Sequence, residues 1–379
     1  MLDIFNKSGF HFSTLRGGRE QAMKRLILSF CFAMVLSFEL PSTAAEVIHY
    51  QVVKSFGGVP NDGASPWTSL AQGADGALYG TTYMGGSNNA GIFYKMNLDG
   101  SGYAVLHHFG TGASTTGDGR NPLCDLTTAS DGQLYGTTLG GGSGGGGTVF
   151  KMHTDGSGYT ILRSFLVGSG GELNAGLIEG SDGVLYGTFT TGPFDTYAGA
   201  VFAMNKDGTG YRLLHRFGPY NSNDGLQPLA PVMEGSDHVL YGTTSTGGGS
   251  AVGSIFKVNR DGSGYQKLYA FDFGGGVINP FAGLLEGSDH ALYGTGGGGG
   301  GGVFKLNKDG TGYQVLVGFN GDRPYAALAR SRDGALYSTT YMGGTAGYGR
   351  VFRINEDGSG YQILHNFGGA AADGYPDGH

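Results

Sequence analysis

One unit of about fifty residues recurs six times along the chain, and this repetition constrains the fold more than any other feature. The second copy, residues 133–165, reads QLYGTTLGGGSGGGGTVFKMHTDGSGYTILRSF. Its first landmark is Leu-Tyr-Gly, or Leu-Tyr-Ser in the last copy, with spacings of 56, 51, 55, 52 and 44 residues, at Leu78, Leu134, Leu185, Leu240, Leu292 and Leu336. A second landmark is an aromatic residue, at Tyr94, Phe150, Phe202, Phe256, Phe304 and Phe352. The third is Asp-Gly-Ser/Thr-Gly-Tyr, which begins at Asp99, Asp155, Asp207, Asp261, Asp309 and Asp357.

Each copy is expected to form four β-strands. In the second copy these are residues 122–129, 133–138, 148–153 and 159–165, with a flexible glycine loop at 140–147. The third strand shows the period-two alternation of a pleated strand. Asp-Gly pairs between the strands favour tight turns, because Asp bonds locally to the backbone and Gly accepts positive φ. The glycines also oppose a helix, at about 1 kcal/mol each relative to Ala.

Four antiparallel strands per unit, repeated six times, predict an all-β fold, a β-propeller of four-stranded blades. One such unit cannot bury both of its faces. Blades arranged around an axis cover one another with their Leu, Tyr, Phe and Val side chains. The alternative fold, a β-solenoid, normally has much shorter rungs.

The N-terminus lies outside the repeats. Residues 1–22 carry no propeller pattern, and we interpret them as an extension before a true start at Met23. A basic pair at 24–25 precedes an apolar run at 26–38, which has the length of a signal peptide and is too short to span a bilayer as a helix. Small residues before Glu46 predict cleavage near Ala45. An uncleaved N-terminal anchor is the alternative.

We therefore expect two parts, an extension with a signal peptide at 1–45 and a propeller domain at 46–379, in an exported protein that is extracellular, on the cell surface or periplasmic. Removing 1–45 leaves 18 basic and 27 acidic residues, a net charge of -9, which argues against nucleic acid and anionic membranes as partners. The mature part would keep one cysteine, Cys124, and hence no disulfide. We interpret this cysteine as a small buried hydrophobe.

Residues 46–56 resemble a fourth strand without the three strands before it. The sixth copy already has its own fourth strand at 361–367, and residues 373–376 look like the start of another copy. The expected architecture is thus six complete repeats plus an orphan N-terminal strand. Either the ring closes with six blades or a seventh blade has been truncated, and we favour truncation.

The motifs LYGTT, GTVFKM and DGSGYTILRSF resemble the Gloeo/Verruco tandem repeat of "choice-of-anchor" bacterial surface proteins. The resemblance covers residues 48–379, and three motifs recur in fixed order. It implies an exported protein. It implies no activity and no catalytic residues, and the sorting signal with which such proteins often end has no counterpart in this sequence.

The loops between strands two and three (2–3 loops) and those between one repeat and the next (4–1 loops) are expected to share one face of the propeller. We call it the variable-loop face, because the loops on it differ most between repeats. The 2–3 loops are rich in glycine and poor in catalytic groups. The 4–1 loops carry acids and arginines suited to sugar hydroxyls, with Trp67 or Tyr220 as an apolar platform. Our candidate ligand-binding residues are Asp62, Trp67, Asp118, Arg120, Asn174, Asp224, Asp322 and Arg323. The alternative is that Asp-Gly-x-x-Pro is simply a turn that aims the next blade.

No catalytic, metal or cofactor site is predicted. The Asp-Gly-Ser/Thr-Gly turns have too few oxygens for a calcium loop, and we interpret them as hairpin turns. His107, His215 and His365 fall in separate outer strands, too far apart to share a metal. His238 and His290 replace turn glycines, where positive φ is expected.

These patterns favour an exported binding or scaffold protein whose variable-loop face contacts a carbohydrate or another surface protein. This hypothesis rests on the repeats, the signal peptide and the scarcity of catalytic groups. A propeller enzyme acting on glycans, as lyase or hydrolase, is the alternative. A purely structural surface repeat protein is the third hypothesis.

Overall fold

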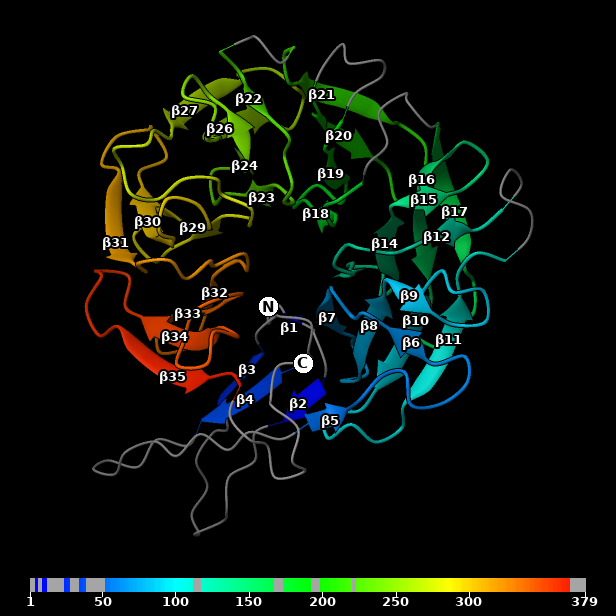
Figure 1. Ribbon diagram of the computed structural model, residues 1–379. Coiled ribbons are helices and arrows are strands. Elements are labelled where there is room, and N and C mark those ends of the chain that lie inside the picture. Colours follow the sequence, from blue (N-terminus) through cyan, green and yellow to red (C-terminus); the bar gives the residue numbers. More distant parts are fainter. Residues whose placement is uncertain are drawn as a thin grey trace.

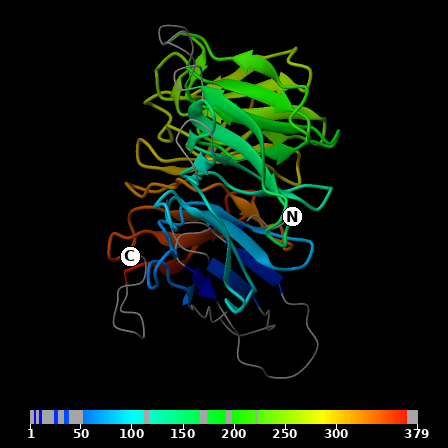
Figure 2. The same ribbon diagram turned by 90° about the vertical axis from the view of Figure 1, so that its right-hand side faces the viewer.

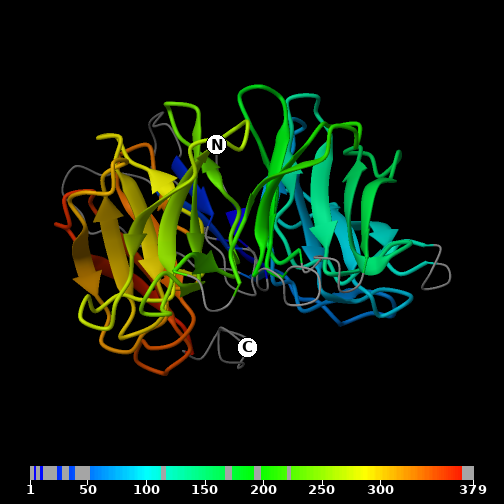
Figure 3. The same cartoon turned by 90° about the horizontal axis from the view of Figure 1, so that it is seen from above.

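The six repeats fold as six four-stranded antiparallel blades around a common axis, so the predicted all-β propeller is confirmed (Figure 1). The computed structural model describes residues 52–111, 117–166, 173–191, 198–219 and 223–368, and the backbone of four short N-terminal strands. Every regular element in these ranges is a strand. From the sides, the blades stand next to one another and their loops form two faces (Figures 2 and 3).

In every blade the strand order follows the sequence, from the innermost first strand to the outermost fourth. The first three blades comprise β7 (Ser69–Gln72), β8 (Leu78–Thr82), β10 (Ile92–Met96) and β11 (Ala104–His108); β13 (Thr127–Thr128), β14 (Leu134–Thr138), β16 (Gly145–Met152) and β17 (Thr160–Leu166); β18 (Ile178–Glu179), β19 (Leu185–Phe189), β20 (Ala200–Met204) and β21 (Arg212–Arg216).

The other three comprise β23 (Met233–Glu234), β24 (Val239–Thr244), β26 (Ser254–Asn259) and β27 (Gln266–Ala270); β28 (Leu285–Glu286), β29 (Leu292–Gly296), β30 (Gly302–Leu306) and β31 (Gln314–Gly318); β32 (Ala329–Arg330), β33 (Leu336–Thr340), β34 (Arg350–Ile354) and β35 (Gln362–Asn366).

The first strand of the second blade is much shorter than predicted. We expected residues 122–129, but β13 contains only two residues. The preceding segment bonds to the neighbouring blades instead of to β14. Cys124 Sγ donates to the carbonyl of Leu173 at 2.8 Å, and Asp125 accepts a hydrogen bond from the backbone of Ser69 at 2.7 Å. Cys124 is buried, as expected, and burial raises the pKa of its thiol to about 12.

The glycine of the Leu-Tyr-Gly motif makes room for an aromatic ring. In the second blade Gly136 of β14 pairs with Phe150 of β16. A Cβ at Gly136 would lie 2.6 Å from the Phe150 ring and 2.9 Å from Leu126. The Phe150 ring can lie across β14 because Gly136 has no side chain. The glycine of the first sequence landmark and the aromatic residue of the second therefore depend on each other.

The hydrophobic core lies between blades rather than within them. At the boundary between the first two blades, Tyr79, Phe93 and Phe109 of one blade pack with Leu134 and Phe150 of the next. Similar clusters join the later blades in sequence order. A blade thus buries its apolar side chains only when its neighbour is present.

The 2–3 and 4–1 loops lie together at one end of the blades, as predicted, because they pair with each other in small ribbons. The ribbons join β6 (Gly63–Ala64) to β9 (Met84–Gly85), β12 (Gly119–Arg120) to β15 (Gly140–Gly141), and β22 (Gly225–Leu226) to β25 (Thr246–Gly247). The prediction of a flexible loop at 140–147 was therefore wrong, since β15 and the first residues of β16 occupy this segment.

A further sheet lies between the sixth and the first blade in Figure 1, with the order β3-β4-β2-β5. Its β5 (Val52–Lys54) belongs to the predicted orphan strand, and Val53 and Phe56 pack against the first blade. The other N-terminal strands are β1 (Ile4–Phe5), which pairs with β7, β2 (Gly9–His11), β3 (Lys24–Ile27) and β4 (Met34–Phe38). The predicted cleavage near Ala45 and the segment 373–376 lie outside the described residues. In the described part of the chain, no helix is long and apolar enough to cross a membrane.

Candidate functional site

The acids predicted in the 4–1 loops lie at the boundaries between blades. Asp118 comes after the outer strand of the first blade, and only 8% of its surface is exposed. Its carboxylate accepts a hydrogen bond from Tyr159 Oη of the next blade at 2.5 Å and lies 2.8 Å from His107 Nε2 of β11. The hydroxyl of Thr111 donates to it at 3.1 Å. Asp118 therefore connects two neighbouring blades.

We call this arrangement of outer-strand residue, acid and tyrosine the blade lock. Acid and tyrosine are 41 residues apart in each lock. The two further locks consist of Lys54, Asp62 and Tyr103, and of His215, Asp224 and Tyr265. Lys54 Nζ and Tyr103 Oη donate to Asp62 at 2.8 and 2.5 Å, and His215 Nε2 lies 3.1 Å from Asp224. Asp62, Asp118 and Asp224 thus each bond on both sides of a boundary.

The outer-strand residue of the lock stacks on the tyrosine ring of the next blade. It stands two places before the last phenylalanine of its repeat. His107 lies parallel to Tyr159, with ring centroids 4.0 Å apart, and the guanidinium carbon of Arg163 lies 3.5 Å from the ring centre of Tyr211. The same contact is made by Lys54 on Tyr103, His215 on Tyr265 and Tyr269 on Tyr313. At these five boundaries the position therefore holds a flat or cationic group that can stack on a ring.

Of the three remaining boundaries, two depart from this pattern within the described residues, and at the third, where Arg163 stacks on Tyr211, residues 167–172 of the 4–1 loop lie outside the described part. In the fifth repeat Gly276 stands four residues before the proline, where the preceding repeat has Asp224, and the buried hydroxyl of Tyr313 has no hydrogen-bond partner. At the last boundary Val317 cannot supply a cation. There Arg350 of β34 forms an ion pair with Asp322, whose exposed fraction is 6%.

The lock acids are held in their charged form. Burial alone would raise the pKa of Asp118, but hydrogen bonds from His107 and Tyr159 outweigh burial and lower it. The pKa of Asp62 and of Asp224 is lowered in the same way. The pKa of Tyr159 is raised by burial and by the charge of Asp118, so the phenol remains a donor.

The other four predicted residues lie apart from the locks. Trp67 is 41% exposed and stacks on Tyr83 with ring centroids 4.7 Å apart. Arg323 is exposed, Arg120 is half-buried in β12, and Asn174 donates a hydrogen bond to Thr190 at 3.0 Å. The structure thus does not gather the eight residues into one cluster. Tyr220 lies outside the described residues.

The sequence reasoning missed an aromatic group on the same face. Tyr325 stacks on Tyr341 with centroids 5.7 Å apart, and Phe281 meets Tyr325 edge-on at 4.8 Å. A signal was present, because Tyr-Met-Gly-Gly occurs at residues 83–86 and again at 341–344. Trp67, Phe281 and Tyr325 each directly follow the proline of a 4–1 loop, so these rings lie on the variable-loop face.

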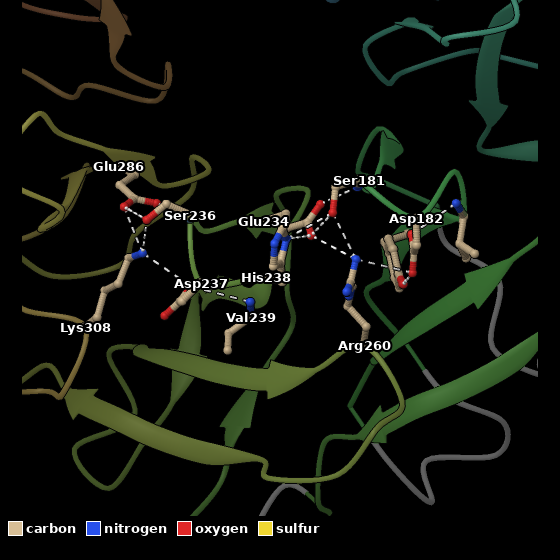
Figure 4. Close-up of polar contacts among 12 residues, drawn as sticks. Ser181, Asp182, Glu234, Ser236, Asp237, His238, Val239, Arg260, Glu286 and Lys308 are labelled. Atoms are coloured by element: carbon tan, nitrogen blue, oxygen red, sulfur yellow. Dashed lines mark hydrogen bonds and ion pairs between the residues drawn. The ribbon is translucent and has the colours of Figure 1, made fainter.

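The opposite face carries charged contacts, shown in Figure 4, that we call turn clamps. Glu286 of β28 accepts hydrogen bonds from the backbone and hydroxyl of Ser236 in the preceding blade, at 2.7 and 2.6 Å, and pairs with Lys308 at 2.8 Å. In the same way, Glu234 accepts hydrogen bonds from Ser181 and pairs with Arg260. Glu179 likewise accepts hydrogen bonds from Ser130 and pairs with Lys206.

The last clamp has its charges exchanged between elements. Glu356, in the turn after β34, accepts hydrogen bonds from Ser288, while Arg330 of β32 pairs with Glu356 at 3.0 Å. In the other clamps the glutamate is on the first strand and the cation follows the third. In the last clamp an arginine thus replaces the glutamate of the first strand and a glutamate replaces the cation after the third, so the two positions still carry opposite charges.

The turn clamps contain serine, histidine and glutamate close together, yet they do not form a catalytic triad. His238 Nδ1 lies 3.0 Å from the Ser181 hydroxyl and 3.1 Å from Glu234. A triad needs the acid on one ring nitrogen and the nucleophile on the other, whereas here one nitrogen faces both. His238 and His290 both have φ of 62°, which confirms that they occupy positions suited to glycine.

The structure also shows an open hollow beside the lock of Asp118. It has a volume of about 570 Å³ and is lined by His107, Thr111, Gly117, Asp118, Tyr159, Thr160 and Ile161. Within the described ranges, no group of three or more His, Cys, Asp or Glu side chains could hold a metal ion.

The fold and its repeated motifs define a β-propeller repeat protein. Residues 36–220 and 177–379 match the Gloeobacter/Verrucomicrobia repeat, and the chain belongs to this family. The family resemblance expected from the sequence is thereby confirmed. No curated protein matches the chain.

Among solved structures, the chain is similar to an oligogalacturonate lyase from Vibrio parahaemolyticus, with 12% identity and a TM-score of 0.53, over 90% of this chain and 88% of that one. It is also similar to a putative 6-phosphogluconolactonase from Bacteroides uniformis, with 13% identity and a TM-score of 0.52, over 87% and 91%. At such low identity these similarities concern the fold alone.

Proposed function

We propose that this chain is an exported binding protein whose variable-loop face contacts a carbohydrate or a surface protein. The observation that supports the proposal is the location of its exposed large hydrophobic side chains. Within the described ranges, all of these except Ile363 lie in the 2–3 or 4–1 loops or at their edges: Val59, Trp67, Met84, Leu166, Phe273, Tyr341, Met342 and Tyr348. Apolar side chains gathered on one face of a soluble protein mark an interaction surface.

The scaffold suits this role. Blade locks bond successive blades near the variable-loop face, and turn clamps bond them at the opposite face. Loops held on such a framework keep their geometry, which reduces the entropy lost on binding. The family assignment is consistent with export but assigns no ligand.

The proposal is tested by probing immobilised full-length chain with a glycan array and with surface-protein extracts of the producing cell. Two charge reversals make a matched pair. Arg323→Glu changes the variable-loop face, and Arg332→Glu changes an exposed turn on the opposite face. We expect binding to be weakened by Arg323→Glu and retained by Arg332→Glu.

Binding that is lost only with Arg332→Glu would place the interface on the wrong face and overturn the proposal. Turnover of a glycan such as oligogalacturonate by the purified chain would favour the enzyme hypothesis instead. Self-assembly without any ligand would favour a structural surface repeat.

A further inference from the structure

The exposed rings on the variable-loop face are built from one pair of positions that recurs in every blade. The first is the residue after the proline of the 4–1 loop, or its counterpart Asn174 in the third repeat, and the second directly follows strand two. In several blades the second position donates its backbone N–H to the carbonyl of the residue two places before the first position. Tyr83 donates its N–H to the carbonyl of Ser65 at 2.9 Å, and Tyr341 donates to Arg323 at 2.7 Å. We call the pair the platform positions.

Only two blades carry aromatic residues at both platform positions. They are the first blade, with Trp67 and Tyr83, and the sixth, with Tyr325 and Tyr341. The intervening blades have the pairs Leu123 and Leu139, Asn174 and Thr190, Leu229 and Ser245, and Phe281 and Gly297. The first and sixth blades are those that flank the sheet containing β5 (Figure 1). The aromatic pairs are thus confined to one side of the ring.

Both pairs present flat, oriented rings. The two planes in each pair differ by 19°, so one ring supports the other from behind. Trp67 is 41% exposed and Tyr341 44%. An aromatic side chain has few rotatable bonds and is fixed further by its partner, so it loses little additional conformational entropy when a ligand stacks on it.

The chain segments around three of the four platform residues are uncharged, whereas Tyr325 follows the exposed Arg323 and the buried, ion-paired Asp322. Residues 63–73, 80–91 and 338–349, which contain three of the four platform residues, include no Asp, Glu, Lys or Arg. Gly85, Gly86, Gly343 and Gly344 follow shortly after the tyrosines and add no side chain beside the rings. Flat apolar rings bordered by neutral polar groups match a pyranose ring, which has an apolar face and hydroxyls around its edge.

We propose that the Trp67–Tyr83 and Tyr325–Tyr341 pairs are two platforms for sugar rings of a neutral polysaccharide. This inference rests on the proposed function and names its ligand class. A long polymer can bind both platforms of one chain at once, and its overall affinity would then exceed its affinity for either platform alone.

Trp67 is the only tryptophan of the chain, so its fluorescence reports directly on the first platform. Full-length protein is titrated with gluco-, xylo- and manno-hexaose. We expect at least one of them to change the Trp67 emission in a saturable manner. In calorimetric titrations with that sugar, Trp67→Ala and Tyr341→Ala should each weaken binding about tenfold or more.

Two controls accompany these variants. Ile363→Ala removes the one exposed large hydrophobic side chain of the described residues that lies outside the variable-loop face, 38% exposed, and should leave affinity unchanged. Tyr341→Phe retains the ring and should restore most of the affinity lost in Tyr341→Ala, which separates ring stacking from a folding defect.

The outcomes distinguish the inference from the proposed function. If a glycan or surface protein binds but neither Trp67 emission nor the platform variants change its affinity, the platforms are excluded and the binding function stands. If the platforms prefer charged oligogalacturonate over all three neutral sugars, the ligand class is wrong. If nothing binds the folded chain, both fail.

Discussion

At the scale of single residues, one position of the repeat accepts chemically different side chains and keeps one role at every blade boundary except the last, where Val317 stands. Lysine, histidine, arginine and tyrosine all occur two places before the last phenylalanine, and each stacks on the tyrosine of the next blade. Stacking tolerates this variety because a cation and a flat ring both interact favourably with an aromatic face. Within the lock, the acid and the tyrosine hydroxyl supply the directional bond.

The locks allow a matched comparison of two tyrosines. Tyr159→Phe removes a hydrogen bond to the charged Asp118, so we expect the free energy of unfolding to fall by about 1.5 kcal/mol or more. Tyr313→Phe removes a buried hydroxyl that has no partner, so stability should stay within about 0.5 kcal/mol of the parent or increase. Urea unfolding of the three proteins measures both. Equal losses would show that the Asp118 bond contributes no special stability.

Sequence reasoning identified the lock acids but not their partners. The Asp-Gly-x-x-Pro motif marks a turn rich in polar groups, and both a ligand site and an aiming turn follow from that pattern. The tyrosine that meets Asp118 lies 41 residues further on, in another blade. Its approach depends on how the blades stack, which local sequence does not encode. The platform pairs were not predicted for the same reason, since each pair joins residues that are distant in the sequence. The repeated Tyr-Met-Gly-Gly was nevertheless visible in the sequence.

At the scale of elements, the prediction was accurate where strands pair within a blade and wrong where loops pair across the surface. Strands two and three have regular alternation and were predicted within a few residues, except that β16 starts earlier. Strand one was overestimated, since residues before β13 bond to adjacent blades. The glycine loop was taken as flexible because no local pattern shows that Gly141 will pair with Gly119.

The turn clamps predict how these elements respond to acid. Burial would raise the pKa of Glu286, but hydrogen bonds from Lys308, Ser236 and His290 lower it to about 2. A carboxyl whose pKa is lower in the folded state stabilises the fold above its unfolded pKa, about 4.3, and this contribution disappears as the pH falls toward 2. Glu286→Gln should therefore cost on the order of 1–2 kcal/mol at pH 7, after allowance for solvent screening.

The difference between the parent and Glu286→Gln should stay constant from pH 7 to about 5 and vanish near pH 2, as measured by chemical unfolding at each pH. Asp272→Asn is the control for net charge, because Asp272 is exposed in a 4–1 loop away from the clamps. A difference that persists at pH 2 would mean that Glu286 acts through shape or neutral hydrogen bonding rather than through its charge.

At the scale of the whole molecule, the repeat period was sufficient to predict the ring because each blade needs neighbours to bury its core. The number of sheets in the ring, however, does not follow from the number of repeats alone. Six blades come from the repeats, and a further sheet that includes β5 lies between the last and the first. The orphan strand was recognisable from its likeness to a fourth strand, whereas the other strands of its sheet, β2 to β4, come from a stretch without any propeller pattern.

That sheet makes the fate of the N-terminus a test of the whole architecture. We predict that the exported chain begins at Glu46, because a basic pair, an apolar run and small residues precede it. Cleavage would remove β1 to β4. The strand β5 should nevertheless remain, because Lys54 bonds to Asp62 at 2.8 Å and Phe56 contacts Tyr94 with ring centroids 5.1 Å apart.

Intact mass and N-terminal sequencing of protein recovered from outside the cytoplasm measure the outcome. Ala45→Arg provides the control, since a large charged residue at this position should prevent cleavage and leave a longer chain. If the exported protein carries residues 24–38, the stretch functions as part of the β3-β4-β2-β5 sheet and the signal-peptide interpretation is wrong. If it begins at Glu46, the ring must be stable with β5 as the only strand left from that sheet, held by the first blade lock.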